Sequence, residues 1–212
     1  MTHKTHPKVY RIKSPKDWLS QGFYDKEMNK KLEEDFKIRK FLEEKIERLY
    51  IEKIEIEREL GKINVILYTS RPGVIIGKKG QDVENLKNEI EKKILKQKGV
   101  LRIEVREVEN PWTCAALVAK WMANQVEKRM PYRKVLKGAL AKVSSQKGVL
   151  GVRVQLKGRL DGTEISRREW MQKGRLPRQS LRAEVDYGEA QAFCTYGVVG
   201  AKIWIFKGEK LD

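Results

Sequence analysis

The stretch Val74-Ile75-Ile76-Gly77-Lys78-Lys79-Gly80-Gln81-Asp82-Val83 decides how this sequence is interpreted. Two glycines three positions apart let the chain turn tightly, and they place no Cβ atom between the backbone and an approaching ligand. Val83, Leu86 and Ile90 recur at helical spacing, so we expect a helix directly after the turn. The free N–H groups at a helix start bind phosphate oxygens well. With Lys78 and Lys79 between the glycines, the stretch predicts a loop that contacts a nucleic-acid backbone.

The segments around this turn indicate the layout of its domain. Apolar residues at helical spacing predict a helix over residues 28–50, and β-branched residues predict a β-hairpin over residues 51–69. Alternating residues predict a closing strand over residues 101–108. This order of elements resembles a type II KH domain, whose loop clamps about four nucleotides. Dinucleotide binding needs GxGxxG and a Walker loop needs GxxxxGK followed by Ser or Thr, and neither motif is present.

A second unit begins at Pro111. Helical spacing predicts helices over residues 113–130 and 132–147. Later patterns predict strands over residues 151–160, 181–187 or a little further, and 195–206, with a short helix near residues 166–172. The predicted fold class is α+β, with a type II KH domain followed by a domain of two helices on a small, mainly antiparallel sheet. We divide the chain into a basic N-terminal arm (1–20), the KH domain (21–109) and a C-terminal α+β domain (110–212).

The charge of the chain is strongly positive, with 46 Lys and Arg against 29 Asp and Glu and a net charge of +17. Residues 128–182 hold sixteen of the basic residues and three acids, which gives this window a charge of +13. Solubility favours interspersed signs, so a single-sign surface of this length indicates a polyanion such as structured RNA. On the predicted helix from Tyr132, Arg133, Lys134 and Lys137 fall within an arc of about 100°.

Several classes of site are not expected. The two histidines, His3 and His6, lie near the N-terminus, and the two cysteines, Cys114 and Cys194, form no CxxC pair. We therefore expect no catalytic site, metal, cofactor or small-molecule substrate. No apolar run reaches the roughly 18 residues of a membrane span, and no secretory signal is evident, so we expect a cytoplasmic protein that does not bind membranes.

Several separate stretches resemble the family of bacterial small-subunit ribosomal protein S-three. They run from His6-Pro7 and Ser70-Arg71-Pro72-Gly73 through Gly158-Arg159-Leu160 and Glu169-Trp170 to the segment TYGVVGAKIWIFKGE, residues 195–209. The resemblance implies a place on the head of the small subunit, with ribosomal RNA and neighbouring head proteins as partners. It also implies that Arg133, Lys134 and Lys137 lie where messenger RNA enters and help to open its secondary structure.

The arm and the basic window supply the expected contacts to ribosomal RNA. These contacts are Lys4, Lys8, Arg11, Lys13, Arg159, Arg167, Arg168, Arg175 and Arg178. We expect most of the five tryptophans to pack in a core rather than stack on bases.

Two other functions remain open. A free-standing KH regulator would bind messenger RNA outside the ribosome. A nuclease or lyase would need a carboxylate pair, but Glu33-Glu34 and Glu43-Glu44 occur on a helix rich in balancing Lys and Arg.

Overall fold

The computed structural model describes residues 5–11, 18–22, 28–46, 50–59, 61–95 and 99–209. The chain forms two compact units. One consists of Ser14–Glu109, and the other combines Asn110–Asp212 with Met1–Lys13.

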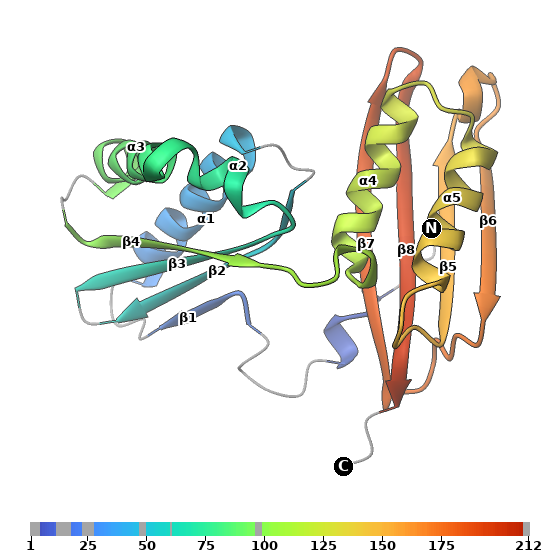
Figure 1. Ribbon diagram of the computed structural model, residues 1–212, viewed down its shortest axis with the longest axis horizontal. Coiled ribbons are helices and arrows are strands. Elements are labelled where there is room, and N and C mark those ends of the chain that lie inside the picture. The colour runs from blue at the N-terminus through green and yellow to red at the C-terminus, as the bar shows by residue number, and fades with distance from the viewer. Residues whose placement is uncertain are drawn as a thin grey trace. The chain divides into compact units, whose positions relative to one another are not determined.

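The first unit is a four-stranded sheet with three helices on one of its faces (Figure 1). The sheet has the order β1-β2-β3-β4, in which β2 and β3 are antiparallel and the two outer pairings are parallel. Its elements are β1 (Ser20–Gly22), α1 (Met28–Lys45), β2 (Ile51–Glu59), β3 (Lys62–Thr69), α2 (Pro72–Ile76), the short turn η3 (Lys78–Gly80), α3 (Gln81–Ile90), the π-helical turn η4 (Glu91–Leu95) and β4 (Leu101–Glu107).

The core of this unit lies between the helices and the sheet. Leu42 of α1, Ile75 of α2 and Ile90 of α3 are buried in one cluster with strand residues such as Val65 and Leu67. The hairpin, the turn and the helix after it match the elements predicted for a type II KH domain. Sequence patterns did not predict β1, a three-residue strand, and α1 ends at Lys45, before the predicted end of that helix.

A buried ion pair joins α1 to the sheet of the first unit. Arg58 on β2 donates from Nη2 to Asp35 Oδ1 at 2.6 Å and from Nη1 to Glu34 Oε2 at 3.0 Å. The side chains of Arg58 and Asp35 are only 9% and 2% exposed. Because a charge buried without its partner is costly, this contact fixes how α1 sits on β2.

The second unit is an antiparallel sheet of order β6-β5-β8-β7, with α4 and α5 covering one face (Figure 1). Its elements are η5 (Pro111–Thr113), α4 (Ala115–Glu127), α5 (Tyr132–Ser144), β5 (Gly151–Gly158), η6 (Leu160–Gly162), β6 (Arg167–Gly174), β7 (Ala183–Cys194) and β8 (Gly197–Glu209). The predicted α+β class, with two helices on an antiparallel sheet, is confirmed.

Alternation along β5 separates the two faces of this sheet. Val152, Val154 and Leu156 are buried in the core under the helices, so Arg153 points to the other face. We call this other face of β6-β5-β8-β7 the helix-free face.

The prediction of a short helix over residues 166–172 is wrong, because this segment lies in β6. β6 is an edge strand whose side chains are mostly exposed, so it lacks the apolar alternation that marks a strand in sequence. The alternation of a strand is seen only in the structure. Met171 packs on the core under the helices, and Trp170 pairs with Gln155 on the helix-free face.

The described part of the N-terminal arm, residues 5–11, packs on the second unit and ends in η1 (Val9–Arg11). The His6 ring meets the Tyr187 ring edge-on at 4.8 Å, and Lys8 Nζ lies 2.8 Å from Asp186 Oδ1. Arg11 donates to the backbone oxygens of Ala183 and Arg178, each at 3.0 Å. Contacts within the chain therefore hold this part of the arm.

Candidate nucleic-acid interface

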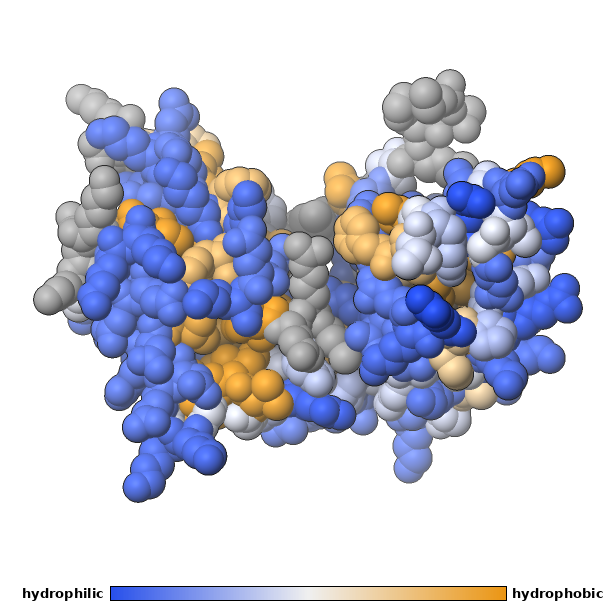
Figure 2. Space-filling model, turned by 90° about the horizontal axis from the view of Figure 1, so that it is seen from above, coloured by the Kyte–Doolittle hydropathy of each residue, from blue (hydrophilic) through white to orange (hydrophobic). Residues whose placement is uncertain are grey.

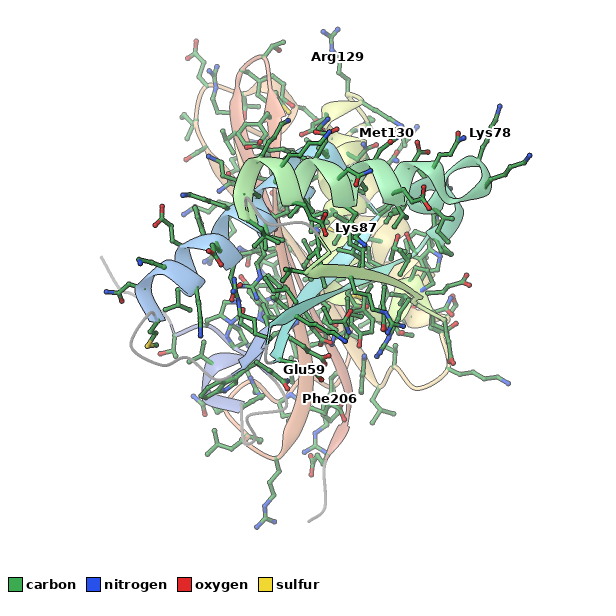
Figure 3. The ribbon with its side chains drawn as sticks, turned by 90° about the vertical axis from the view of Figure 1, so that its left-hand side faces the viewer. Glu59, Lys78, Lys87, Arg129, Met130 and Phe206 are labelled. Atoms are coloured by element: carbon green, nitrogen blue, oxygen red, sulfur yellow. The ribbon has the colours of Figure 1, made fainter. Side chains whose placement is uncertain are left out.

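The GKKG turn lies between α2 and α3. Gly77 and Gly80 have φ angles of 70° and 79°, a region that residues with a Cβ rarely adopt. Lys79 also has a positive φ, 55°, and such outliers gather at functional sites. Both lysines are exposed, and Figure 3 shows Lys78 projecting away from the ribbon. The turn thus presents two cations on a backbone that a ligand can approach closely.

Two acids beside this turn limit its positive charge. Asp82 and Glu84 lie in the first turn of α3, where carboxylates interact favourably with the helix dipole. A Cβ atom added at Gly77 would lie 1.8 Å from Asp82 Oδ2, so the carboxylate of Asp82 sits directly against the turn. An RNA phosphate at the GKKG turn would meet this carboxylate as well as Lys78 and Lys79.

The three predicted messenger contacts share one exposed face of α5. Arg133, Lys134 and Lys137 are all exposed, whereas Val135 and Leu136 of the same helix are buried. None of the three cations forms an ion pair with an acid in the described part of the chain. Arg133 Nε donates to Tyr132 Oη at 3.1 Å, and this hydrogen bond raises the pKa of Arg133.

The predicted ribosomal-RNA contacts differ in the ion pairs and hydrogen bonds that they already form within the chain. Arg175 lies 3.3 Å from Glu209, and Arg159 donates to the backbone oxygens of Thr163 and Tyr196. Arg167 and Arg168 are both exposed on β6, and their side chains form no ion pair or hydrogen bond with described residues. Arg178 is exposed next to the arm, and its backbone oxygen accepts from Arg11.

The contacts predicted in the arm are only partly described. Lys8 pairs with Asp186, and the guanidinium of Arg11 donates to four backbone oxygens, including that of Pro7 at 2.8 Å. The bonds to Ala183, Arg178 and Ser180 therefore fasten the arm to the rest of the second unit. Lys4 and Lys13 lie outside the described residues.

The excess positive charge belongs almost entirely to the second unit. Ser14–Glu109 contains 22 basic and 20 acidic residues, whereas the second unit contains 24 basic and 9 acidic residues. The net charges are therefore +2 and +15.

Ion pairing follows the same division between the units. In the first unit Lys45 and Lys93 pair with Glu89, and Arg102 and Arg106 pair with Glu104. The cations on α5 and β6 of the second unit lack such partners among the described acids. Cations without acid partners are the ones available to phosphates.

Figure 2 shows mainly hydrophilic residues on the face in view, with separate hydrophobic patches. At the turn from α4 to α5, Figure 3 shows the basic side chain of Arg129 projecting outward.

Two residues of the helix-free face, Trp170 and Arg153, were not predicted as RNA contacts. Trp112, Trp121 and Trp204 are partly buried against core clusters, as expected for most tryptophans. Trp170 is 48% exposed and lies over the guanidinium of Arg153 at 4.1 Å. The signal in the sequence was Arg153 itself, a charge between two valines that belong to the core.

The described residues hold no metal-binding group and no membrane-spanning helix. No group of three or more His, Cys, Asp or Glu among them is placed to hold a metal ion. None of their helices combines the length and the apolar character of a membrane span. Cys114 and Cys194 are free thiols, and Cys114 is buried.

Both units match known protein families. The KH domain family matches residues 37–113, and the family described as "Ribosomal protein S3, C-terminal domain" matches residues 122–205. The small ribosomal subunit protein uS3 of Maridesulfovibrio salexigens is 45% identical over 212 residues, which cover 100% of this chain and 98% of the relative. That of Thermodesulfovibrio yellowstonii is 46% identical over 209 residues, covering 99% of this chain and 95% of the relative. This chain therefore belongs to the uS3 family of small ribosomal subunit proteins.

Proposed function

We propose that this protein is a structural constituent of the small ribosomal subunit and that its second unit binds ribosomal RNA. The observation that carries the proposal is the charge of +15 on this unit together with the cations on α5 and β6 that lack acid partners among the described residues. Each phosphate held by such a cation releases counterions and adds affinity that does not depend on sequence. The relatives named as small ribosomal subunit proteins support the assembly.

Family membership confirms that the chain is not an enzyme, since the family consists of structural constituents. It supports ribosome association as its location and, by extension, the cytoplasm.

In the assembled subunit, the protein would lie on the head, next to other head proteins, with α5 facing the path by which messenger RNA enters. Arg133, Lys134 and Lys137 would capture the backbone of single strands as they form. Opening of messenger hairpins would then be passive, since capture of single strands needs only a positive groove and no nucleotide hydrolysis.

The GKKG turn supports a second candidate function. Because Lys78 and Lys79 are exposed on a turn with positive φ angles, a free-standing KH regulator of messenger RNA is a defined alternative. Such a regulator would bind short single strands and would not accompany ribosomal subunits.

Sedimentation of tagged protein from a cell lysate separates the two candidates. We expect the protein to travel with the small subunit in magnesium and to remain with its ribosomal RNA when magnesium is lowered. Protein that stays in the light fractions in both conditions, while binding short messenger fragments, would support the free-standing regulator instead.

A further inference from the structure

Arg153 occupies the centre of the helix-free face. The register places it opposite Gln172 of β6 on one side and Trp204 of β8 on the other. Its guanidinium lies 4.1 Å from the ring centroid of Trp170 and 5.9 Å from that of Trp204. Two indole rings therefore flank a cation on the sheet face opposite α4 and α5.

The charge of Arg153 is buried without a counter-ion. The residue is 9% exposed, its side chain forms no hydrogen bond or ion pair with any described residue, and its Nε is enclosed without an acceptor. Contact with aromatic rings offsets part of the cost of burying a cation, but it provides no acceptor for the N–H groups. The Nη groups of Arg153 are not enclosed like the Nε, so an anion from outside the chain can reach their N–H groups.

Further positive charge surrounds this residue. Burial lowers the pKa of Arg153, and the positive charges of Arg178 and Arg168 lower it further. Glu189, on β7 of the same face, is engaged by Lys202 at 3.2 Å and by the hydroxyl of Tyr187 at 2.7 Å. Three arginines thus gather at one place, and an anion there would relieve their mutual repulsion.

Trp170 adds an exposed aromatic ring, which a site for an anion alone does not require. It is 48% exposed on an edge strand, although burying a large indole normally stabilises a fold. Stacking uses the flat face of the Arg153 guanidinium and leaves its in-plane N–H groups for a phosphate. The exposed part of the indole can stack on a base, as aromatic side chains do in proteins that bind single strands.

We propose that Trp170 and Arg153 form a site for one unpaired nucleotide of RNA. The base stacks on the indole, and the adjoining phosphate is held by the guanidinium of Arg153 with Arg168 and Arg178 beside it. The site rests on the proposed function, because it requires that the second unit binds RNA. We favour RNA over an acidic peptide because a flat aromatic surface next to a cluster of arginines matches a base joined to a phosphate.

The test uses the full-length protein and measures binding to an oligouridine of about eight nucleotides and to a small-subunit ribosomal RNA transcript across a salt series. Arg153→Gln should weaken oligouridine binding roughly tenfold and reduce the salt slope by about one, because one phosphate contact is lost. Trp170→Leu should weaken it about tenfold with little change of slope, since stacking carries no charge. Phe36→Leu is the matched control, because Phe36 is an aromatic side chain that is 67% exposed on α1 of the first unit, and this variant should bind like the parent.

A second variant guards against misfolding at the buried position. Arg168→Gln with Arg178→Gln changes two exposed side chains and should reproduce the loss of affinity with an unchanged thermal midpoint.

Each remaining outcome has a defined meaning. If the parent protein binds both RNAs while the Arg153, Trp170 and double-arginine variants bind equally well, this site is wrong and the proposed function stands. If the parent binds neither RNA, the proposed function itself fails. If a polyglutamate peptide of equal length binds as tightly as the oligouridine and loses the same affinity with Arg153→Gln, the site recognises charge alone and the nucleotide assignment fails.

Discussion

Arg133 and Lys134 stand in the first turn of α5, where the helix dipole disfavours positive charge. Asp161 supplies one local acceptor, since its Oδ1 accepts the N–H of Tyr132 at 3.2 Å. It does not form an ion pair with either cation. Stability of the helix alone does not explain these residues, which is consistent with a role in binding a polyanion.

Replacing Arg133, Lys134 and Lys137 with Ala should slow translation through a stable messenger hairpin several-fold and leave translation of an unstructured messenger unchanged. The thermal midpoint of the isolated protein should stay equal or rise slightly, because two charges opposed to the helix dipole are removed. The control replaces Lys93, Arg102 and Arg106, which are paired with acids in the first unit. Equal pausing by the parent and by the α5 variant would remove the messenger role.

A separate prediction concerns the GKKG turn. Lys78→Asp with Lys79→Asp should weaken binding of the isolated protein to RNA and reduce the slope of log affinity against log salt by roughly one to two, as expected for two lost phosphate contacts. Lys92→Asp with Lys93→Asp changes the charge of the same unit by the same amount at the other end of α3. If both variants show the same slope, the turn is not a phosphate contact.

The positions of single residues could be predicted where the residues follow the regular period of a helix. The helical period put Arg133, Lys134 and Lys137 on one face, and all three are exposed on α5. Trp170 and Arg153 could not be paired in this way, because they lie on different strands and meet only through the register of β5 with β6. The hydrogen bonds from Arg11 to the backbone of Ala183, Arg178 and Ser180 could not be predicted either, since these residues lie more than 160 positions away.

At the scale of elements, the Arg58–Asp35 contact is expected to decide whether α1 stays on β2. Arg58→Met should destabilise the first unit by about 3 kcal/mol, because it leaves the carboxylate of Asp35 buried without its cation. Adding Asp35→Leu should recover most of this loss, since an apolar pair replaces a buried charge. Hydrogen exchange of the β2 amides reports both effects, and single and double variants that exchange alike would contradict this account.

The elements that were predicted well are those buried on one side. β5 alternates valine with polar residues, and the hairpin β2–β3 is rich in isoleucine, so their patterns were clear. β6 and β1 are edge strands with little buried surface, and their sequences therefore lack the apolar alternation of a strand. The short helix predicted over residues 166–172 was wrong because packing, not propensity, determines the strand form of this segment.

For the whole molecule, the two units divide the charge between them. The first unit, at +2, joins cations such as Lys45, Lys93, Arg102 and Arg106 to its own acids, whereas the second, at +15, leaves those of α5 and β6 without described acid partners. Net charge alone would attract RNA to the molecule, but the pairing of each cation should determine where the phosphates are held.

The most direct test compares two variants with the same net charge. One changes Arg133, Lys134, Lys137 and Arg167 to Gln, and the other changes Lys45, Lys93, Arg102 and Arg106 to Gln. Binding of the full-length proteins to small-subunit ribosomal RNA is measured from low to high salt. We predict that the first variant loses roughly three to four from the salt slope, close to one for each lost phosphate contact, and that the second keeps the parent's slope. Equal slopes in the two variants would contradict the claim that the unpaired cations of the second unit hold the RNA.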